Sequence, residues 1–285
     1  MTTPSTQRPQ RVWFITGASR GFGALIAREA LARGDAVVAT ARRPETVVAA
    51  LGAHPDLLAV ALDVTDEHQA QEAVRQAVGR FGRIDVLVNN AGFGVLGATE
   101  EIAAADVEAV YRTNVFGLLA VTRAALPQLR RQGSGHIVNL SSIGGYQSFM
   151  GWGVYASTKF AVEGLSEGLA MEVGPLGIKV TIVEPGFFRT DFLDQASLVT
   201  SPTVIDDYAA TAGALRRGAV DLNHRQPGDP ARLAKALLTV VDAPEPPLRM
   251  PFGSDTVAAI EAKNAFVAGE LAKWRELAVS TDFPA

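Results

Sequence analysis

Short runs of apolar and β-branched residues recur along the chain and alternate with longer amphipathic stretches. The runs lack regular polar alternation, as expected for strands buried on both faces of a parallel sheet. They cover residues 12–16, 36–40, 57–62, 84–89, 136–141 and 179–184. Apolar positions at helical spacing fill the intervals, over residues 22–33, 67–81, 104–132 and 154–174. This alternation predicts an α/β fold with a doubly wound parallel sheet flanked by helices.

After residue 185 the alternation becomes less regular. A helix is expected from Pro230, a last strand near residues 248–252 and a closing helix over 256–276. The last strand would bring the sheet to about seven strands. The stretch 187–226 has the length of a mobile lid. We expect residues 1–285 to form one domain, with a core at about 11–190 and a lid with a C-terminal extension at about 187–285.

Composition narrows the classes of function. The 285 residues are 48% hydrophobic and carry a net charge of −4, so the core is sizeable and no basic face suggests a nucleic-acid partner. Cysteine is absent and the four histidines are far apart in sequence, so we expect no disulfide, no thiol catalysis and no metal site. No uncharged apolar run reaches the roughly 18 residues of a membrane helix. A cytoplasmic protein without a membrane partner is expected.

The first expected strand leads into a glycine-rich turn and then a helix. The turn reads Thr-Gly-Ala-Ser-Arg-Gly-Phe-Gly over residues 16–23. Glycines at this spacing let the backbone approach a pyrophosphate at the helix N-terminus, which predicts a dinucleotide site. The candidate contacts in the turn are Gly17, Ser19, Arg20, Gly21, Phe22 and Gly23.

The end of the second expected strand indicates which dinucleotide binds. About 20 residues after the first glycine, where a carboxylate would accept the ribose hydroxyl of NAD, the chain has Arg42 and Arg43. Arg20 of the glycine turn is expected to face the same place. Arginines can bind a 2′-phosphate through paired hydrogen bonds. NADP(H) is therefore favoured, with NAD(H) as the alternative.

Tyr155 and Lys159 lie four positions apart at the start of an expected helix, on one helix face. A phenol ionises near pH ~10, too high for proton exchange at neutrality. An ammonium about 4 Å away would lower that pKa by roughly three units at an effective dielectric of about 20. The pair therefore predicts a general acid–base group.

With these residues the chain resembles the short-chain dehydrogenase/reductase (SDR) family, in its single-domain branch. The resemblance covers about residues 11–190. The glycine turn fits that branch's Thr-Gly-x-x-x-Gly-x-Gly motif, and Tyr155 with Lys159 fits its Tyr-x-x-x-Lys motif. Further motifs follow in the family's order: Asp63-Val64, Asn89-Asn90-Ala91-Gly92, Asn114, Ser142 thirteen positions before Tyr155, and Pro185-Gly186 with Thr190. The resemblance implies a Rossmann-like oxidoreductase whose core binds a nicotinamide dinucleotide.

The resemblance also implies a role for each residue. Tyr155 would be the general acid in ketone reduction and the base in alcohol oxidation, and Lys159 would lower its pKa and bind the nicotinamide ribose. Ser142 would hold the substrate oxygen, and Asn114 would anchor a water that relays protons. Strand alternation sends Ser141, the rival for the serine role, to the opposite face. The remaining cofactor contacts would be Asp63, Val64, Asn90, Ala91, Gly92, Pro185, Gly186, Phe188 and Thr190.

The substrate is expected at the carboxyl ends of the strands. The loops there are rich in aromatic residues and glycine, which suits a hydrophobic ketone, aldehyde or alcohol. The candidate substrate contacts are Phe93, Gly144, Phe149, Trp152, Phe187 and Phe192. Family members pair through the helix at 154–174, so the resemblance implies a homodimer or homotetramer.

Two other classes of function fit parts of the sequence. Gly17-Ala-Ser19-Arg-Gly21 also fits the nucleophile elbow of α/β-hydrolases. A hydrolase would need a catalytic histidine near the end of the chain, and only His224 lies far enough along the sequence. It would also leave Tyr155 and Lys159 without a role. The second alternative is a regulatory protein that binds the dinucleotide without turnover. Such proteins usually lose the tyrosine or the lysine, and both are present here.

Overall fold

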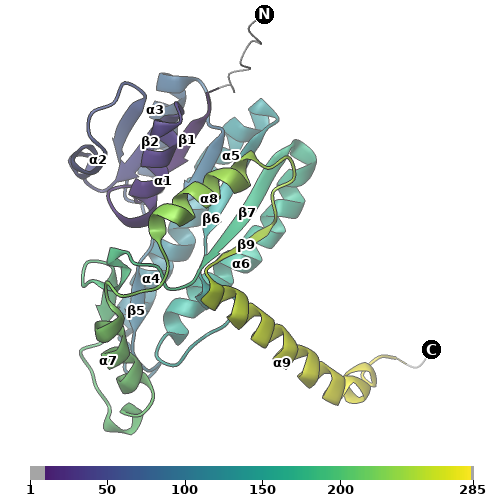
Figure 1. Ribbon diagram of the computed structural model, residues 1–285. Coiled ribbons are helices and arrows are strands. Elements are labelled where there is room, and N and C mark those ends of the chain that lie inside the picture. The colour runs from purple at the N-terminus through teal and green to yellow at the C-terminus, as the bar shows by residue number, and fades with distance from the viewer. Residues whose placement is uncertain (1–9, 284–285) are drawn as a thin grey trace, which may run out of the picture.

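The computed structural model describes residues 10–283 and is built on a seven-stranded sheet (Figure 1). The strand order is β3-β2-β1-β4-β6-β7-β9, and all pairings within this sheet are parallel. The strands are β1 Val12–Ile15, β2 Ala36–Ala41, β3 Leu57–Ala61, β4 Val86–Asn89, β6 Gly135–Leu140, β7 Ile178–Pro185 and β9 Arg249–Phe252. The predicted α/β fold with about seven parallel strands is confirmed.

Helices cover both faces of this sheet, because successive side chains of each strand point to opposite sides. On β1, Trp13 and Ile15 pack in the core beneath one set of helices, whereas Val12 and Phe14 pack beneath the other. The first set is α1 Gly21–Ala32, α2 Pro44–Leu51 and α8 Pro230–Asp242. The second set is α3 Glu67–Phe81, α5 Leu118–Gln132 and α6 Gly153–Val173.

The long helix predicted over residues 104–132 is interrupted. It consists of α4 Ala104–Tyr111, a π-helical turn at Arg112–Gly117, and α5. Gly117 faces Val64, and a Cβ on this glycine would come within 2.7 Å of the valine side chain. The turn also places the Asn114 amide against the backbone of Phe93. These two contacts fix the interruption, and hydrophobic periodicity does not report either of them.

Four short elements were not predicted. They are α2, α7 Ala212–Leu222, and a second two-stranded parallel sheet of β5 Gly94–Leu96 and β8 Leu198–Thr200. Strands of three residues are too short to show a period. The small sheet holds the lid segment against the loop that follows β4.

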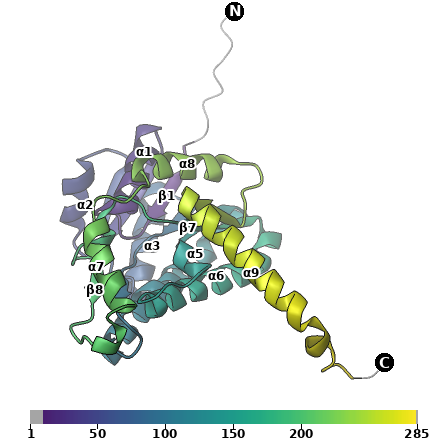
Figure 2. The same cartoon turned by 60° about the horizontal axis from the view of Figure 1, so that its bottom comes forward.

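The region after residue 187 is not all peripheral. Helix α8 packs on α1, and β9 extends the main sheet next to β7. Helix α9, Ser254–Val279, then leaves the sheet and extends away from the rest of the chain in both views (Figures 1 and 2). None of the helices in the described residues is long and apolar enough to cross a membrane.

Candidate active site

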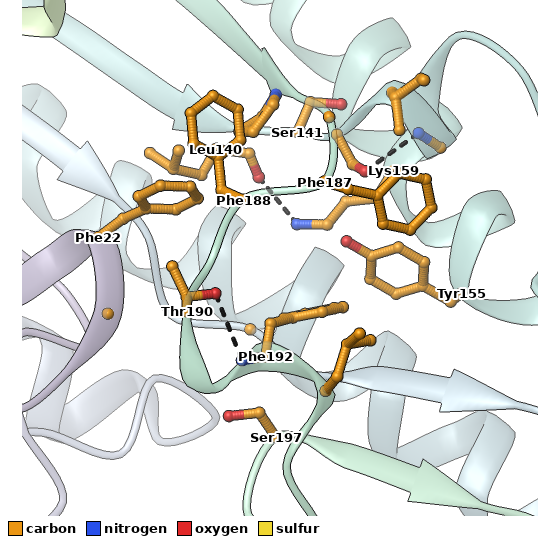
Figure 3. A pocket seen from close by; sticks show the side chains of 18 of the residues that line it. Phe22, Leu140, Ser141, Tyr155, Lys159, Phe187, Phe188, Thr190, Phe192 and Ser197 are labelled. Atoms are coloured by element: carbon orange, nitrogen blue, oxygen red, sulfur yellow. Dashed lines mark hydrogen bonds between the residues drawn. The ribbon is translucent and has the colours of Figure 1, made fainter. Parts of the chain in front are cut away.

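A cavity lies at the carboxyl ends of β1, β4, β6 and β7, between the glycine turn and the start of α6 (Figure 3). The sequence-predicted residues that line it are Gly17, Arg20, Gly21, Phe22, Asn90, Ala91, Gly92, Ser142, Gly144, Phe149, Trp152, Tyr155, Lys159, Pro185, Gly186, Phe187, Phe188, Thr190 and Phe192. Residues far apart in sequence therefore meet at one edge of the sheet, as expected for a doubly wound fold.

Tyr155 lies in the first turns of α6 and is buried. Its ring packs edge-to-face on Trp152 and against Phe192, with ring centres 5.6 Å and 5.5 Å apart. Burial raises the pKa of Tyr155 to about 12, and hydrogen bonding to Ser142 offsets this only in part. The expectation of a pKa lowered by Lys159 is therefore not met, and the phenol stays protonated at neutral pH.

The lysine points elsewhere. Its Nζ donates to the carbonyl oxygen of Leu140 at 2.8 Å and lies 5.8 Å from the centre of the Tyr155 ring (Figure 3). Burial lowers the pKa of Lys159 to about 8, while the Glu163 carboxylate one turn further along α6 raises it. The ammonium is thus fixed to the end of β6 rather than to the phenol.

Ser141 and Ser142 leave the end of β6 in opposite directions. The Ser142 hydroxyl accepts a hydrogen bond from the N–H of Gly144 at 3.0 Å. It also hydrogen-bonds the Tyr155 hydroxyl, which lowers the pKa of the phenol against the larger effect of burial. The hydroxyl of Ser141 lies on the side of Glu163, whose pKa it lowers against the larger effect of burial. Alternation along the strand therefore places Ser142, and not Ser141, beside the phenol.

Asn114 sits in the π-helical turn and is buried. Its Oδ1 accepts from the N–H of Phe93 at 3.1 Å, and its Nδ2 donates to the carbonyl of Phe93 at 2.9 Å and to Thr158 at 3.1 Å. A Cβ at Gly92 would lie 3.0 Å from Asn114 Oδ1 and 3.8 Å from Lys159 Nζ. Asn114 thus links the loop after β4 to the helix that carries Tyr155 and Lys159.

The glycine turn has the shape of a phosphate cradle. Gly17 and Gly21 have φ of +64° and +55°, which favour glycine. A Cβ on Gly23 would come within 2.5 Å of the Gly17 carbonyl oxygen, so the turn closes only without side chains. Asn90 braces it, with Nδ2 donating to the carbonyls of Thr16 and Gly17 at 2.9 and 3.0 Å. The turn opens α1, whose N-terminus offers free N–H groups. These residues fit a dinucleotide.

The arginines are not gathered as predicted. Arg42 and Arg43 are exposed at the end of β2. Arg20 does not face them, because its Nη2 donates to the carbonyl of Ala196 at 2.7 Å and to Ser197 at 2.9 Å. The guanidinium therefore ties the glycine turn to the lid segment. Sequence position cannot indicate the direction of a long side chain.

Four further candidate cofactor residues do not line the cavity. Asp63 accepts from the N–H and the hydroxyl of Thr65, which shapes the turn before α3. Val64 is buried beside Gly117. Ser19, like Gly23, belongs to the glycine turn but is not a lining residue.

All but one of the candidate substrate residues line the cavity. Phe93 does not line the cavity; it packs against the cluster of Val95, Ile102 and Val110, because Asn114 holds its backbone on that side. The rings of Trp152 and Phe192 stack at 6.5 Å and form an aromatic wall beside Tyr155.

Several lining residues were not predicted, namely Leu140, Ser141, Asp191, Ser197 and Gln226. Gln226 is 1% exposed, and neither atom of its side-chain amide has a hydrogen-bond partner among the described residues. A lone glutamine in a lid sequence carries no signal for such a position. A buried amide without partners is costly unless a bound molecule satisfies it.

One histidine lies closer to acids than its sequence position suggests. His224, with φ of +58°, has its Nε2 3.1 Å from Asp194, and Asp191 is adjacent. Asn223 donates to the same carboxylate oxygen at 2.6 Å. These contacts join two parts of the lid.

Comparison with known proteins identifies the family. The sequence model described as short chain dehydrogenase matches residues 11–198. The chain belongs to the short-chain dehydrogenase family. Relatives include "Oxidoreductase BOA17" of Botryotinia fuckeliana, 41% identical over 95% of this chain and 99% of the relative. A "3-ketodihydrosphingosine reductase" of Bacteroides thetaiotaomicron is 37% identical over 86% of this chain and 88% of the relative.

Solved SDR structures agree with the fold and bear on the cofactor. A short-chain dehydrogenase from Streptomyces avermitilis is 44% identical, covers 96% of this chain and all of its own, and has a TM-score of 0.89. An SDR from Burkholderia phymatum in complex with NAD has a TM-score of 0.79 at 25% identity, covering 92% of this chain and 95% of its own. The SDR fold neighbours thus include proteins with NAD and, in the case of ElxO, with NADP bound. The chain is an oxidoreductase of a family that uses nicotinamide dinucleotides.

Proposed function

We propose that the protein is an NADP(H)-dependent oxidoreductase that interconverts a ketone or aldehyde and an alcohol on a hydrophobic small molecule, with Tyr155 as general acid and base. The observation that supports this most directly is the buried Tyr155 phenol beside the Ser142 hydroxyl, on the wall of a cavity that also contains the glycine turn. Residues 1–285 would act as one domain, since α8 and β9 complete the core.

Residues of the chain supply the proton for the reaction and stabilise the charge that develops on the substrate oxygen. Bound nicotinamide would supply or accept the hydride. During reduction Tyr155 gives its phenolic proton to the carbonyl oxygen, and Ser142 donates a hydrogen bond to the same oxygen as negative charge grows there. A pKa near 12 keeps the proton on Tyr155 until that charge develops.

Lys159 and Asn114 support this site. Lys159 lies at the end of β6 with its ammonium on the cavity wall, where it can hydrogen-bond a bound ribose. Asn114 fixes the loop after β4 through both polar groups of the Phe93 backbone. We propose that it also holds the water that returns a proton toward Lys159.

The preference for NADP(H) rests on charge. Arg42 and Arg43 are exposed at the end of β2 and form no ion pair with another residue of 10–283, so they can meet a 2′-phosphate. The aromatic wall of Trp152 and Phe192 supports an apolar substrate. The relative named as a 3-ketodihydrosphingosine reductase is consistent with a ketone on an apolar molecule.

The test is carbonyl reduction with NADPH by the wild type and by Tyr155→Phe. The variant should lose turnover by at least about 100-fold, as expected for a general acid, while NADPH affinity stays within a few-fold. Tyr111→Phe is the matched control, because its hydroxyl donates to Ser157 away from the cavity. Near-native rates in Tyr155→Phe would refute the acid–base role. Dinucleotide binding without turnover on any carbonyl would favour the regulatory alternative.

A further inference from the structure

Two carboxyl groups are buried together next to Ser141. Glu163 on α6 is 5% exposed and Glu184 on β7 is 0% exposed. The Ser141 hydroxyl and Glu163 Oε1 lie beside each other under Gly145, where a Cβ would come within 2.3 Å of the hydroxyl and 3.0 Å of the carboxyl oxygen. Ser141 also lines the cavity (Figure 3). The two carboxyls are therefore separated from the active site by one side chain.

A single guanidinium is shared by both carboxyls. Arg249 of β9 has its Nε 3.1 Å from Glu163 Oε2 and 3.4 Å from Glu184 Oε1. Its Nη2 also pairs with the exposed Glu167 of α6. Neither oxygen of Glu184 has a hydrogen-bond partner among residues 10–283. Arg249 alone therefore cannot neutralise and hydrogen-bond two buried carboxylates.

Few other charges act on this pair. Lys159 lies one helical turn before Glu163, whose charge acts on it. Residues 141–149, which follow β6, include no charged side chain. Asp255, at the start of α9, is directed to the backbone N–H of Phe187. The balance is therefore three carboxyls, on Glu163 and its neighbours, against two cations.

One proton held between the two buried carboxyls removes the imbalance. Two carboxylates side by side repel each other, and a buried carboxylate without donors is costly. Burial raises the pKa of both groups, and the charge of Glu163 raises that of Glu184 further, to about 7. A protonated Glu184 can donate to Glu163, which satisfies an oxygen on each side. Such a pair titrates as a unit.

Glu163 and Lys159 do not contact each other, although residues four apart on a helix often form an ion pair. Lys159 Nζ donates to the carbonyl of Leu140, and Glu163 is held by Arg249. Burial lowers the pKa of Lys159 to about 8, and the charge of Glu163 limits this fall. The carboxylate thus supports the ammonium at a distance and leaves it on the cavity wall.

We propose that Glu184 keeps a proton that it shares with Glu163, and that Glu163 is a positioning residue that holds Lys159 as an ammonium on the cavity wall. The shared proton and Arg249 keep the Glu163 carboxylate away from the ammonium. The protonation of the pair is independent of the proposed function. Its benefit to a bound ribose rests on that function, because it requires Lys159 to bind the dinucleotide.

The first test detects the shared proton by infrared spectroscopy of the full-length chain without cofactor. A protonated carboxyl absorbs at a higher frequency than a carboxylate. At pH 6 the difference between the wild type and Glu184→Gln should therefore contain a carboxylic-acid band, which should disappear between pH 6 and 8. Glu167→Gln is the matched control and should give no such band. A Glu184→Gln difference that contains only carboxylate absorption would overturn the shared proton.

The second test titrates Lys159 directly. The chain has five lysines, so NMR of ¹³C-labelled lysine can follow each one, and Lys159→Met assigns the signal. Glu163→Gln should lower the midpoint from about 8 by roughly one pH unit, because a nearby negative charge is lost. Glu163→Asp keeps the charge and should restore most of the midpoint, whereas Glu167→Gln should not change it. An unchanged midpoint in folded Glu163→Gln would overturn the positioning role.

NADPH titration across pH separates this inference from the proposed function. Wild-type affinity should fall above the Lys159 midpoint, and in Glu163→Gln the fall should begin roughly one pH unit lower. A shifted midpoint with an unshifted affinity profile would overturn the role toward the ribose. If the wild type binds no NADPH, the proposed function fails, while the infrared and NMR results still decide the state of the pair and its effect on Lys159.

Discussion

Asp255, in the first turn of α9, accepts a hydrogen bond from the backbone N–H of Phe187 at 2.7 Å. The carboxylate fills the space beside Gly186, where a Cβ would come within 2.2 Å of its oxygens. The C-terminal helix is therefore attached to the loop that follows β7 and lines the cavity. The position of this loop therefore depends on Asp255, which lies 68 residues after Phe187 in the sequence.

We expect Asp255→Ala to loosen that loop, lowering kcat/KM by about 10-fold and stability by about 1–3 kcal/mol, the usual range for a charge-assisted hydrogen bond. Asp255→Asn should restore most of the activity, since its amide oxygen can still accept from Phe187. Steady-state kinetics and urea unfolding would measure both effects. The control is Asp229→Ala, which removes the N-cap of α8 and should cost about 1 kcal/mol without changing kcat/KM. Equal kinetic effects at both positions would contradict a positioning role.

Lys159 should make stability rise with pH above neutrality. Its pKa is lowered by burial from 10.5 to about 8, so between these values the unfolded chain binds more protons than the folded one. The free energy of unfolding then increases with pH, by up to about 3 kcal/mol over that interval. Tyr155 works in the opposite sense only above pH 10, because its pKa is raised to about 12.

The measurement is urea unfolding between pH 7.5 and 9.5, below the range where Tyr155 contributes. Lys159→Met should be more stable than the wild type at pH 7.5 and should lose the upward slope. Lys235→Met, at an exposed position of α8, should keep the slope of the wild type. A slope that persists in Lys159→Met would show that another group causes it.

Hydrophobic periodicity was sufficient to predict the seven strands and the long helices. Apart from α9, these elements bury continuous apolar surface, so each pattern repeats often enough to be recognised. It did not predict β5, β8 or α7, and it joined α4 to α5. The interruption at Asn114 depends on contacts with Phe93 and Val64, which come from other elements. Short-range patterns contain no information about such tertiary contacts.

For the site residues, too, local backbone pattern predicted some side-chain positions, whereas contacts with other segments determined the rest. Strand alternation correctly gave the different sides of Ser141 and Ser142, because the extended backbone continues past the end of β6, where the Ser141 N–H donates to the carbonyl of Val183. The direction of Arg20 and the packing of Phe93 were predicted wrongly, since each depends on a partner contributed by another segment, Ser197 in one case and Asn114 in the other. The predicted direction of the Tyr155 pKa shift was wrong, because the argument from the Lys159 charge did not include burial, which raises the pKa.

Arg42 provides a test of cofactor preference. Replacing Arg42 by Asp should lower the ratio of NADPH to NADH affinity by about 10- to 100-fold, because a like charge would then face the 2′-phosphate. Energy transfer from tryptophan to the reduced nicotinamide measures both affinities. Arg20→Ala should leave the ratio unchanged, since that guanidinium binds the lid. If Arg42→Asp leaves the ratio unchanged and Arg43→Asp lowers it, recognition depends on the second arginine.

Replacing Gln226 should stabilise the protein without ligand and weaken ligand binding in the cavity. In Gln226→Leu a buried amide without partners is replaced by an apolar side chain, so the free energy of unfolding should rise by about 1–3 kcal/mol. The same change should weaken whatever hydrogen-bonds this amide in the cavity, raising either the NADPH dissociation constant or the KM for the carbonyl by about 10-fold. Gln76→Leu, at an exposed position on α3, is the control and should leave both constants unaltered. A Gln226→Leu variant that is more stable and binds both molecules normally would show that the amide faces the cavity without using it.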